Sequence, residues 1–159
     1  MKLRLHQKQE LEETEIDIVY SRMTKRLSKM VSYIRQYAYM VEAFCDGKSF
    51  LIPLDEILYF DTTDRKTFLY TNKQVYECRK TLITVENELS NTTIIRINKG
   101  TLLNITALVN VSPYPNHRLL AELSNGEHLI ISRKYISVLQ NTIRSFLYNS
   151  NIRNSKKEG

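Results

Sequence analysis

A succession of short apolar runs, separated by turn residues, is the feature that most constrains what this chain can fold into. Each run is five to seven residues long and rich in β-branched and aromatic side chains, which predicts strands joined by short turns. The pattern favours the α+β class, with a β-rich domain of antiparallel hairpins. Between the last two runs, Asn125-Gly126 predicts a two-residue type I′ turn with positive φ at both residues. The eight runs occupy residues 50–54, 57–63, 67–71, 74–78, 93–97, 107–113, 118–124 and 128–132.

Three segments instead show the helical spacing of apolar residues. The first covers residues 21–43, with Ser21 as its predicted N-cap, and the second covers residues 81–89. The third covers residues 133–148 and follows another candidate N-cap, Ser132. The apolar positions of the first segment are Leu27, Met30, Val31, Ile34, Ala38 and Val41, and those of the third are Ile136, Leu139, Ile143 and Phe146.

The chain of 159 residues is long enough for one sizeable core. We predict that residues 1–46 form an N-terminal module, in which strands at residues 2–5 and 15–21 precede the first helix. Residues 47–148 then form the β-rich domain. Residues 149–159 lack an apolar period and are predicted to be a disordered tail.

The net charge of +6 is unevenly distributed along the chain. Residues 21–53 carry six basic and two acidic side chains, and residues 91–159 carry nine and three. A basic excess favours polyanionic partners such as nucleic acid or an anionic membrane surface, although a solvated surface can carry it without a partner. No apolar run reaches the roughly 18 residues of a membrane span, and the N-terminus lacks the apolar core of a secretory signal. We therefore expect a soluble cytoplasmic protein.

Groups for catalysis or metal binding are sparse in this sequence. None of the three histidines, His6, His117 and His128, has a serine or cysteine in a recognisable nucleophile setting. Cys45 and Cys78 are too few for a usual zinc site. The four glycines form no phosphate-binding loop. We expect no enzymatic activity, no cofactor, no metal and no small-molecule substrate.

Polar side chains interrupt the apolar runs at three places. Arg and Lys donors suit phosphate oxygens and the edge of guanine, while Asn suits the edge of adenine. Cations in the first turn of the third helix oppose its macrodipole, which suggests a use outside the helix. Loops are commonly polar, however, so a solvated surface would explain the same residues. The clusters are Arg65, Lys66 and Thr67; Asn98 and Lys99, followed by Gly100; and Arg133 and Lys134.

Four segments carry a resemblance to a known family through their order and spacing: IPLDEILYFDTTDRKTFLYT, VYECRKTLITVENEL, IIRINKGTLLNI and LAELSNGEHLIISRKYISVL. The succession resembles the LytTR family of bacterial DNA-binding domains from Phe50 to Leu147. The resemblance implies an elongated β fold of small antiparallel sheets, whose loops enter successive major grooves on one face of duplex DNA. The chain also resembles small stand-alone regulators of that family, which lack a phosphoacceptor receiver domain.

The resemblance implies three DNA contacts. Residues 65–67 would form the first reading loop, and Asn98 with Lys99 the second. Arg133 would make the third contact, beside Lys134 on phosphate. The polar break before Gly100 would then be a DNA-binding loop set between two core strands.

Other positions of the same motif are expected to be structural, and some depart from the family. Arg96 and Asn104 match positions that support the second loop. Asn98-Lys99-Gly100 stands where the family often has His-Arg-Ser, and Thr67 stands where one branch has a histidine. Lysine is a point charge and not a bidentate fork, so Lys99 could hold phosphate as readily as it reads guanine.

Two hypotheses follow for the function. The first is a transcriptional regulator that binds double-stranded DNA at repeated short sites as a homodimer, with residues 21–43 and their flanking strands supplying the dimer or partner surface. The second is a regulatory interaction protein, which a small membrane protein captures through the N-terminal module and which has only non-specific affinity for DNA.

Overall fold

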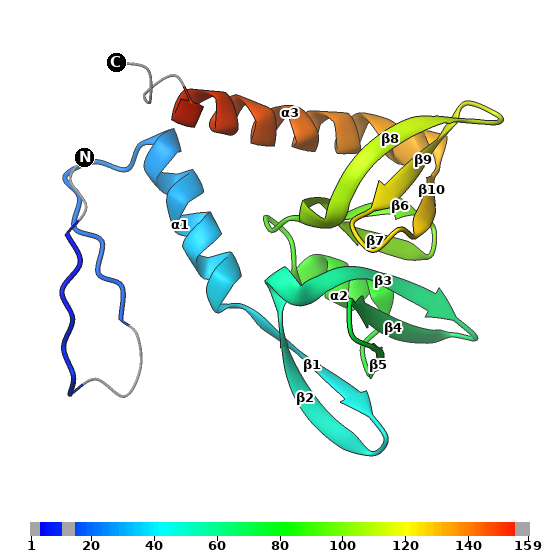
Figure 1. The fold of residues 1–159 in the computed structure, drawn as a ribbon, viewed down its shortest axis with the longest axis horizontal. Coiled ribbons are helices and arrows are strands. Elements are labelled where there is room, and N and C mark those ends of the chain that lie inside the picture. The colour runs from blue at the N-terminus through cyan, green and yellow to red at the C-terminus, as the bar shows by residue number, and fades with distance from the viewer. Residues whose placement is uncertain (1–3, 11–14, 155–159) are drawn as a thin grey trace.

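The protein is built on a seven-stranded antiparallel sheet with a three-stranded sheet beside it (Figure 1). The computed structural model describes residues 4–10 and 15–154. In the larger sheet the strand order is β2-β1-β5-β4-β3-β7-β6, and in the smaller one it is β10-β9-β8. The strands are β1 Met40–Cys45, β2 Lys48–Pro53, β3 Ile57–Thr63, β4 Lys66–Thr71, β5 Val75–Cys78, β6 Ile94–Asn98, β7 Thr101–Asn104, β8 Leu108–Tyr114, β9 Arg118–Leu123 and β10 His128–Ile131.

Three α-helices and three short 3-10 helices complete the fold of the described residues. α2 packs against one face of the larger sheet, and α3 packs beside β6 and continues past the smaller sheet (Figure 1). No helix among the residues that the structure describes is long and apolar enough to cross a membrane. The helices are α1 Lys25–Ala38, η1 Leu54–Glu56, α2 Leu82–Glu88, η2 Ile105–Ala107, η3 Arg133–Tyr135 and α3 Ile136–Asn154.

Strands β3 and β7 are buried on both faces, because successive side chains of a strand point to opposite sides. Phe60 and Leu102 face the core under α2, whereas Tyr59 and Leu103 face the core shared with the smaller sheet and α3. Burial on both sides accounts for the continuous apolar run at the start of β3, where an alternating pattern would leave one face wet.

The core shared with the smaller sheet contains a stacked pair of tyrosines from the neighbouring strands β3 and β4. The rings of Tyr59 and Tyr70 lie with their centroids 4.2 Å apart. Burial raises the pKa of Tyr59 well above its usual range, and a hydrogen bond to Glu127 in the β9–β10 turn raises it further. The phenol therefore keeps its proton at neutral pH, and its contact with Glu127 ties the smaller sheet to β3.

Asn104 is the fully buried polar side chain at the centre of the fold. Its amide nitrogen donates to the carbonyls of Leu54 and Ile57, at 3.2 and 2.8 Å. Its oxygen accepts hydrogen bonds from the backbone N–H and the hydroxyl of Thr106, at 3.2 and 2.8 Å. One side chain thus satisfies backbone groups of both η1 and η2, which flank the central strands.

All eight strands predicted from the apolar runs are present, and the structure adds two more. β7 is the core strand after the polar break. β1 lies where the sequence predicted the end of the first helix, which in fact ends at Ala38. Val41 is spaced like a helical core residue but is buried in β1, which pairs with β2 along its whole length. The larger sheet therefore begins seven residues before the predicted boundary at residue 47.

The predictions for the N-terminal module are partly wrong. Residues 4–5 and 15–21 form no strand, since no described segment pairs with them, and residues 2–3 lie outside the described chain. Without a neighbouring strand, alternating apolar residues have no ladder to join, and the side chain of Val19 is 98% exposed. The N-cap is also misplaced. Thr24, not Ser21, accepts the Leu27 N–H at 3.1 Å and begins α1.

The Asn125-Gly126 turn differs from the predicted type I′ turn. Only Gly126 has positive φ, at 84°, and the Asn125 side chain accepts the Glu127 N–H. The Leu123 N–H donates to the Glu127 carbonyl, so the loop has three residues, which requires a single left-handed position. Among the described residues, positive φ at two successive residues occurs instead at Asp46-Gly47, Asp64-Arg65 and Asn116-His117.

The two C-terminal helix predictions are close to the structure. α2 begins after Thr81, whose hydroxyl accepts the Thr84 N–H at 3.2 Å. Ser132 precedes η3 but makes no capping hydrogen bond through its side chain. α3 continues to Asn154, past the predicted start of the tail at residue 149, because no proline or glycine interrupts it. Residues 155–159 lie outside the described part, as does the side chain of Phe146.

We expect Asn104→Ala to lower the free energy of unfolding by about 2 to 4 kcal/mol, because it leaves several buried backbone groups without partners. Asn141→Ala, at an exposed position of α3, is the matched control and should change it by less than about 0.5 kcal/mol. Urea unfolding of both variants measures the difference. Equal effects would show that the Asn104 network does not stabilise the fold.

Candidate nucleic-acid interface

Three chain reversals meet at one edge of the molecule: the β3–β4 turn, the β6–β7 loop and the junction of β10 with η3 (Figure 1). The Thr62 N–H donates to the Gly100 carbonyl at 3.0 Å, which joins the first two. The Ser132 N–H donates to the Ile97 carbonyl at 2.9 Å, which joins the second to the third. The three predicted polar clusters therefore lie side by side, although they are far apart in the sequence.

The β3–β4 hairpin projects beyond the β6–β7 loop beside it. Thr62 lies level with Gly100, so the turn residues Asp64 and Arg65 extend beyond the β6–β7 loop. Both have positive φ, at 50° and 64°, which gives the tight two-residue turn. The Arg65 side chain is exposed, and so is that of Lys66, whose ammonium lies 4.0 Å from the Glu77 carboxylate.

Thr67 does not belong to this exposed tip. Its side chain is only 3% exposed, and the residue lies in β4 between Thr62 of β3 and Cys78 of β5. A side chain buried to this extent is poorly placed to reach a base, so the geometry does not favour the contact predicted at Thr67. Side chains alternate between the faces of a strand, and the parity of β4 turns Thr67 inward.

The β6–β7 loop is held from within by Asn98. The Asn98 amide nitrogen donates to the Ile130 carbonyl, and its oxygen accepts the Gly100 N–H, both at 2.9 Å. With a donor and an acceptor already engaged, Asn98 is suited to positioning the loop more than to reading a base. Lys99 is the exposed cation at the loop's tip.

Arg96 supports the same loop from the opposite side. Its guanidinium donates to the Glu86 carboxylate of α2 at 2.9 and 2.7 Å, and to the Lys99 carbonyl at 2.6 Å. Its side chain is 13% exposed. The expected supporting role of Arg96 is thus confirmed, whereas Asn104 stabilises η1 and η2 and makes no contact with the loop.

A β-bulge connects this loop to the start of the last helix. The pairing of β6 with β7 shifts register between Arg96 and Asn98, so Ile97 is the extra residue. The Ile97 carbonyl accepts the Ser132 N–H, and η3 begins at the next residue. The bulge therefore fixes η3 beside the loop.

Arg133 and Lys134 are exposed at the start of η3. The Lys134 ammonium lies 5.5 Å from the ring centroid of Tyr135, and no acidic residue occurs in this short helix. These cations precede α3, where the helix macrodipole opposes positive charge, so their position gives α3 no stability. The exposed cations of the whole edge are Arg65, Lys66, Lys99, Arg133 and Lys134.

The chemistry of the edge suits an extended anion. Exposed guanidinium and ammonium groups bind phosphate oxygens, and Arg can also recognise guanine with two donors. Asp61 at the base of the first hairpin accepts hydrogen bonds from Thr62 and Thr101, so its charge is satisfied inside the sheet. In the described part of the chain, no group of three or more His, Cys, Asp or Glu side chains could hold a metal ion.

Comparison with known families gives one match over most of the β-rich region. The LytTr DNA-binding domain matches residues 47–144. A solved LytTr DNA-binding domain from Bacillus cereus superposes with a TM-score of 0.62 at 19% sequence identity, covering 65% of this chain and 95% of that domain. The likeness shows the fold, and it agrees with the expected small antiparallel sheets.

Curated relatives match the same region. The sensory transduction protein LytT of Enterococcus faecalis is 26% identical over 91 residues, which is 57% of this chain. The sensory transduction protein LytR of Streptococcus agalactiae is 26% identical over 92 residues, or 58% of this chain. The match spans only 38% and 37% of the length of these two relatives.

We expect Arg96→Ala to lower the free energy of unfolding by about 1 to 2 kcal/mol and to increase amide hydrogen exchange at Gly100, since the loop loses its inner support. The matched control is Lys80→Ala, which removes the exposed ion pair with Glu88 and should cost less than about 1 kcal/mol. Unchanged exchange at Gly100 in the Arg96 variant would contradict the supporting role.

Proposed function

Because the chain belongs to the LytTR family of DNA-binding domains, we propose that it binds double-stranded DNA through this edge and regulates transcription. The observation that carries the proposal is the convergence of exposed cations from three distant segments, all joined by backbone hydrogen bonds. A loop that is held rigidly loses little conformational entropy on binding, so its contacts contribute more to affinity.

The shape of the edge favours the major groove. A two-stranded ribbon fits a major groove about 12 Å wide, and the β3–β4 hairpin is such a ribbon with Arg65 at its tip. The β6–β7 loop with Lys99 lies beside it. We assign Arg65 and Arg133 to base edges, because a guanidinium can bind guanine with two donors. The three lysines, Lys66, Lys99 and Lys134, are assigned to phosphate, where a point charge is sufficient.

A regulator role is supported by the relatives, which are named sensory transduction proteins. These relatives are much longer than the matched region. The signal to which they respond is therefore not assigned to this chain. We propose sequence-specific binding to short repeated sites, since base-reading loops on one edge cover only a few base pairs each. Phosphate contacts alone would give binding without sequence preference.

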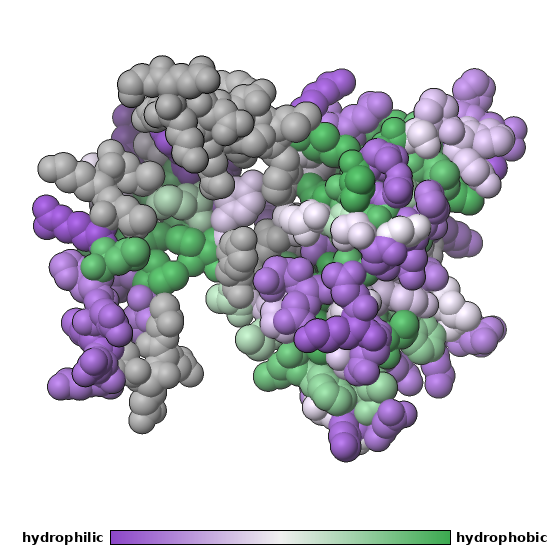
Figure 2. Space-filling view, in the orientation of Figure 1, coloured by the Kyte–Doolittle hydropathy of each residue, from purple (hydrophilic) through white to green (hydrophobic). Residues whose placement is uncertain are grey.

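α1 supports the proposal of a homodimer. Its apolar residues Leu27, Met30, Val31 and Ile34 are only half-buried, and Met23 before it is 48% exposed. Its link to α3 includes a 3.4 Å hydrogen bond from Lys29 to Ser145 (Figure 1). Figure 2 shows apolar surface on the N-terminal side of the molecule, around this helix. A second copy that covers α1 would place two DNA-binding edges on one assembly.

The alternative partner for α1 is a small membrane protein that captures the regulator. The same half-buried apolar face would serve either partner, because both remove apolar surface from water. Self-association of the isolated protein favours the dimer, and a protein that stays monomeric leaves the face to another partner.

We expect Arg133→Ala to weaken binding to the preferred site by about 1 to 3 kcal/mol and to relax the base preference there. Lys134→Ala should weaken preferred and random duplexes alike, and should lower the slope of log affinity against log salt by roughly one unit. Titration of labelled duplexes, chosen by selection from a random pool, measures both effects. An equal loss on preferred and random DNA in the Arg133 variant would contradict its base-reading role.

We expect Val31→Glu to weaken the dimer at least about tenfold, because a carboxylate on the apolar face of α1 must be desolvated on association. Arg26→Gln, at an exposed position on the same helix, is the control and should leave association unchanged. Sedimentation equilibrium gives both constants. If the wild-type chain is monomeric at micromolar concentration, or if both variants associate equally, the dimer surface is not α1.

A further inference from the structure

The tip of the β8–β9 hairpin is an exposed turn, flanked by the partly exposed Arg118, that none of the three contacts uses. It consists of residues 115–117, and its sides are Tyr114 and Arg118, which face each other as the last pair of the ladder. Asn116 and His117 both have positive φ, at 64° and 58°, and both are exposed. Among non-glycine residues, Asn and His tolerate this region comparatively well, so the tip has a fixed shape without the freedom of glycine.

Strand register places this tip beside the edge already described. The last pair between β10 and β9 is Ile131 with Leu119. One step further along the two strands, Arg118 comes level with Ser132, the residue before η3. The turn extends beyond that level, and Figure 1 shows it projecting past the start of α3. The edge therefore continues from Arg133 onto the smaller sheet.

Arg118 is held in place within the hairpin. Its Nε donates to the Pro115 carbonyl at 2.9 Å, and its guanidinium carbon lies 5.0 Å from the ring centroid of Tyr114. Only one of its five N–H donors is used in this way, so the terminal nitrogens remain available. A guanidinium with a fixed orientation loses less freedom when it binds an anion. No acidic residue occurs between Tyr114 and Arg118 to neutralise it.

We propose that the β8–β9 tip is a fourth DNA contact, in which Arg118 binds a backbone phosphate that flanks the bases read by the loops. The proposal rests on the proposed function and extends it, since it lengthens the interface across the smaller sheet. Phosphate is the expected ligand because the Arg118 fork suits two phosphate oxygens. Its Nε donates to the Pro115 carbonyl, which keeps the guanidinium close to the hairpin. The side chain therefore cannot extend far enough to reach base edges in a groove.

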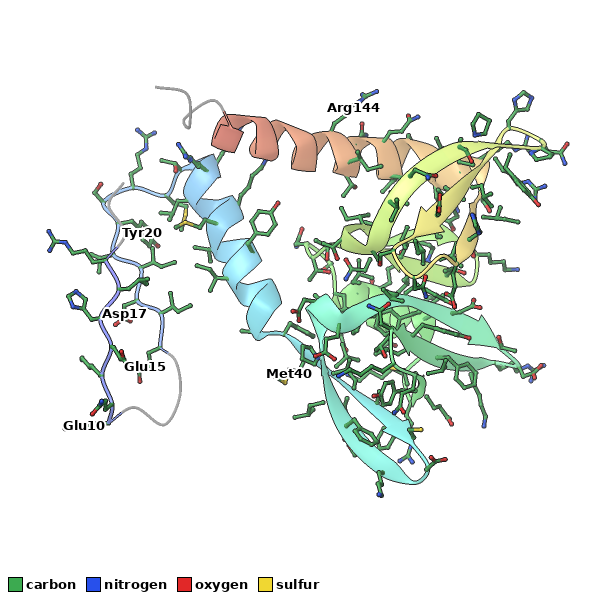
Figure 3. The ribbon with its side chains drawn as sticks, in the orientation of Figure 1. Glu10, Glu15, Asp17, Tyr20, Met40 and Arg144 are labelled. Carbon is green, nitrogen blue, oxygen red and sulfur yellow. The ribbon has the colours of Figure 1, made fainter. Side chains whose placement is uncertain are left out.

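The test uses the full chain and the duplex chosen by selection, with affinity measured across a salt series for Arg118→Ala and Arg144→Ala. Arg144 is an exposed arginine on α3 that points away from the tips of the hairpins (Figure 3). We expect Arg118→Ala to lower the magnitude of the salt slope by roughly one unit without changing sequence preference. Arg144→Ala should match the wild type. Hydroxyl-radical footprinting should show loss of protection at one end of each half-site.

The variant Arg118→Lys separates charge from hairpin structure, since it restores the cation without the hydrogen bond to Pro115. Recovery of the salt slope by lysine supports the phosphate contact. If Arg118→Ala keeps the wild-type slope and footprint while Arg133→Ala loses affinity, the fourth contact is overturned and the proposed function stands. If the wild type shows no DNA binding, both fail. A slope that falls equally for Arg144→Ala would mean general charge loss and would also overturn the contact.

Discussion

Burial of β3 and β7 on both faces is the constraint on which the rest of the structure depends. Alternate side chains of these strands supply two separate cores, so neither strand can slip by one residue without exchanging Phe60 for Tyr59. The fixed register carries Thr62 to Gly100, and with it the β3–β4 turn to the β6–β7 loop. Asn104, at the end of β7, anchors the same strands to η1 and η2. The position of the basic edge is therefore a consequence of the core.

The edge contains two classes of polar residue. One class holds the loops in place, and the other is exposed to solvent and available to bind a ligand. Arg96 and Asn98 resemble their exposed neighbours in chemistry, but their donors are engaged with Glu86, Ile130 and the loop backbone. Lys99, between them in space, has its carbonyl fixed and its ammonium exposed. A charged side chain contributes more to binding when its donors remain free than when most of them are already engaged within the protein. Sequence composition does not distinguish the two classes, because both are polar residues beside a turn.

The strands could be predicted from the sequence because their apolar residues form short local runs. The predictions failed where pairing with a distant segment determines which structure a segment adopts. The helical spacing of the first segment continues to Val41, yet pairing with β2 takes residues 40–45 into the sheet. Residues 15–21 alternate like a strand but have no described partner. Thr67 follows the exposed residues of the first turn in the sequence, and yet its side chain is buried within the sheet. Each failure concerns a hydrogen bond or a facing direction set by a distant segment, which a local pattern cannot contain.

Net charge does not by itself single out the edge, because both signs occur on the other side of the molecule. Glu10, Glu15 and Asp17 lie on the N-terminal segment, on the side of the molecule opposite to the hairpin tips (Figure 3). The N-terminal segment and α1 also carry exposed cations, among them Arg22, Lys25, Arg26 and Lys29. The cations of the edge differ in that they belong to loops held by hydrogen bonds within the fold. A basic excess speeds the approach of a polyanion to any basic face, and the rigid loops then determine which face keeps it, because their contacts cost less conformational entropy.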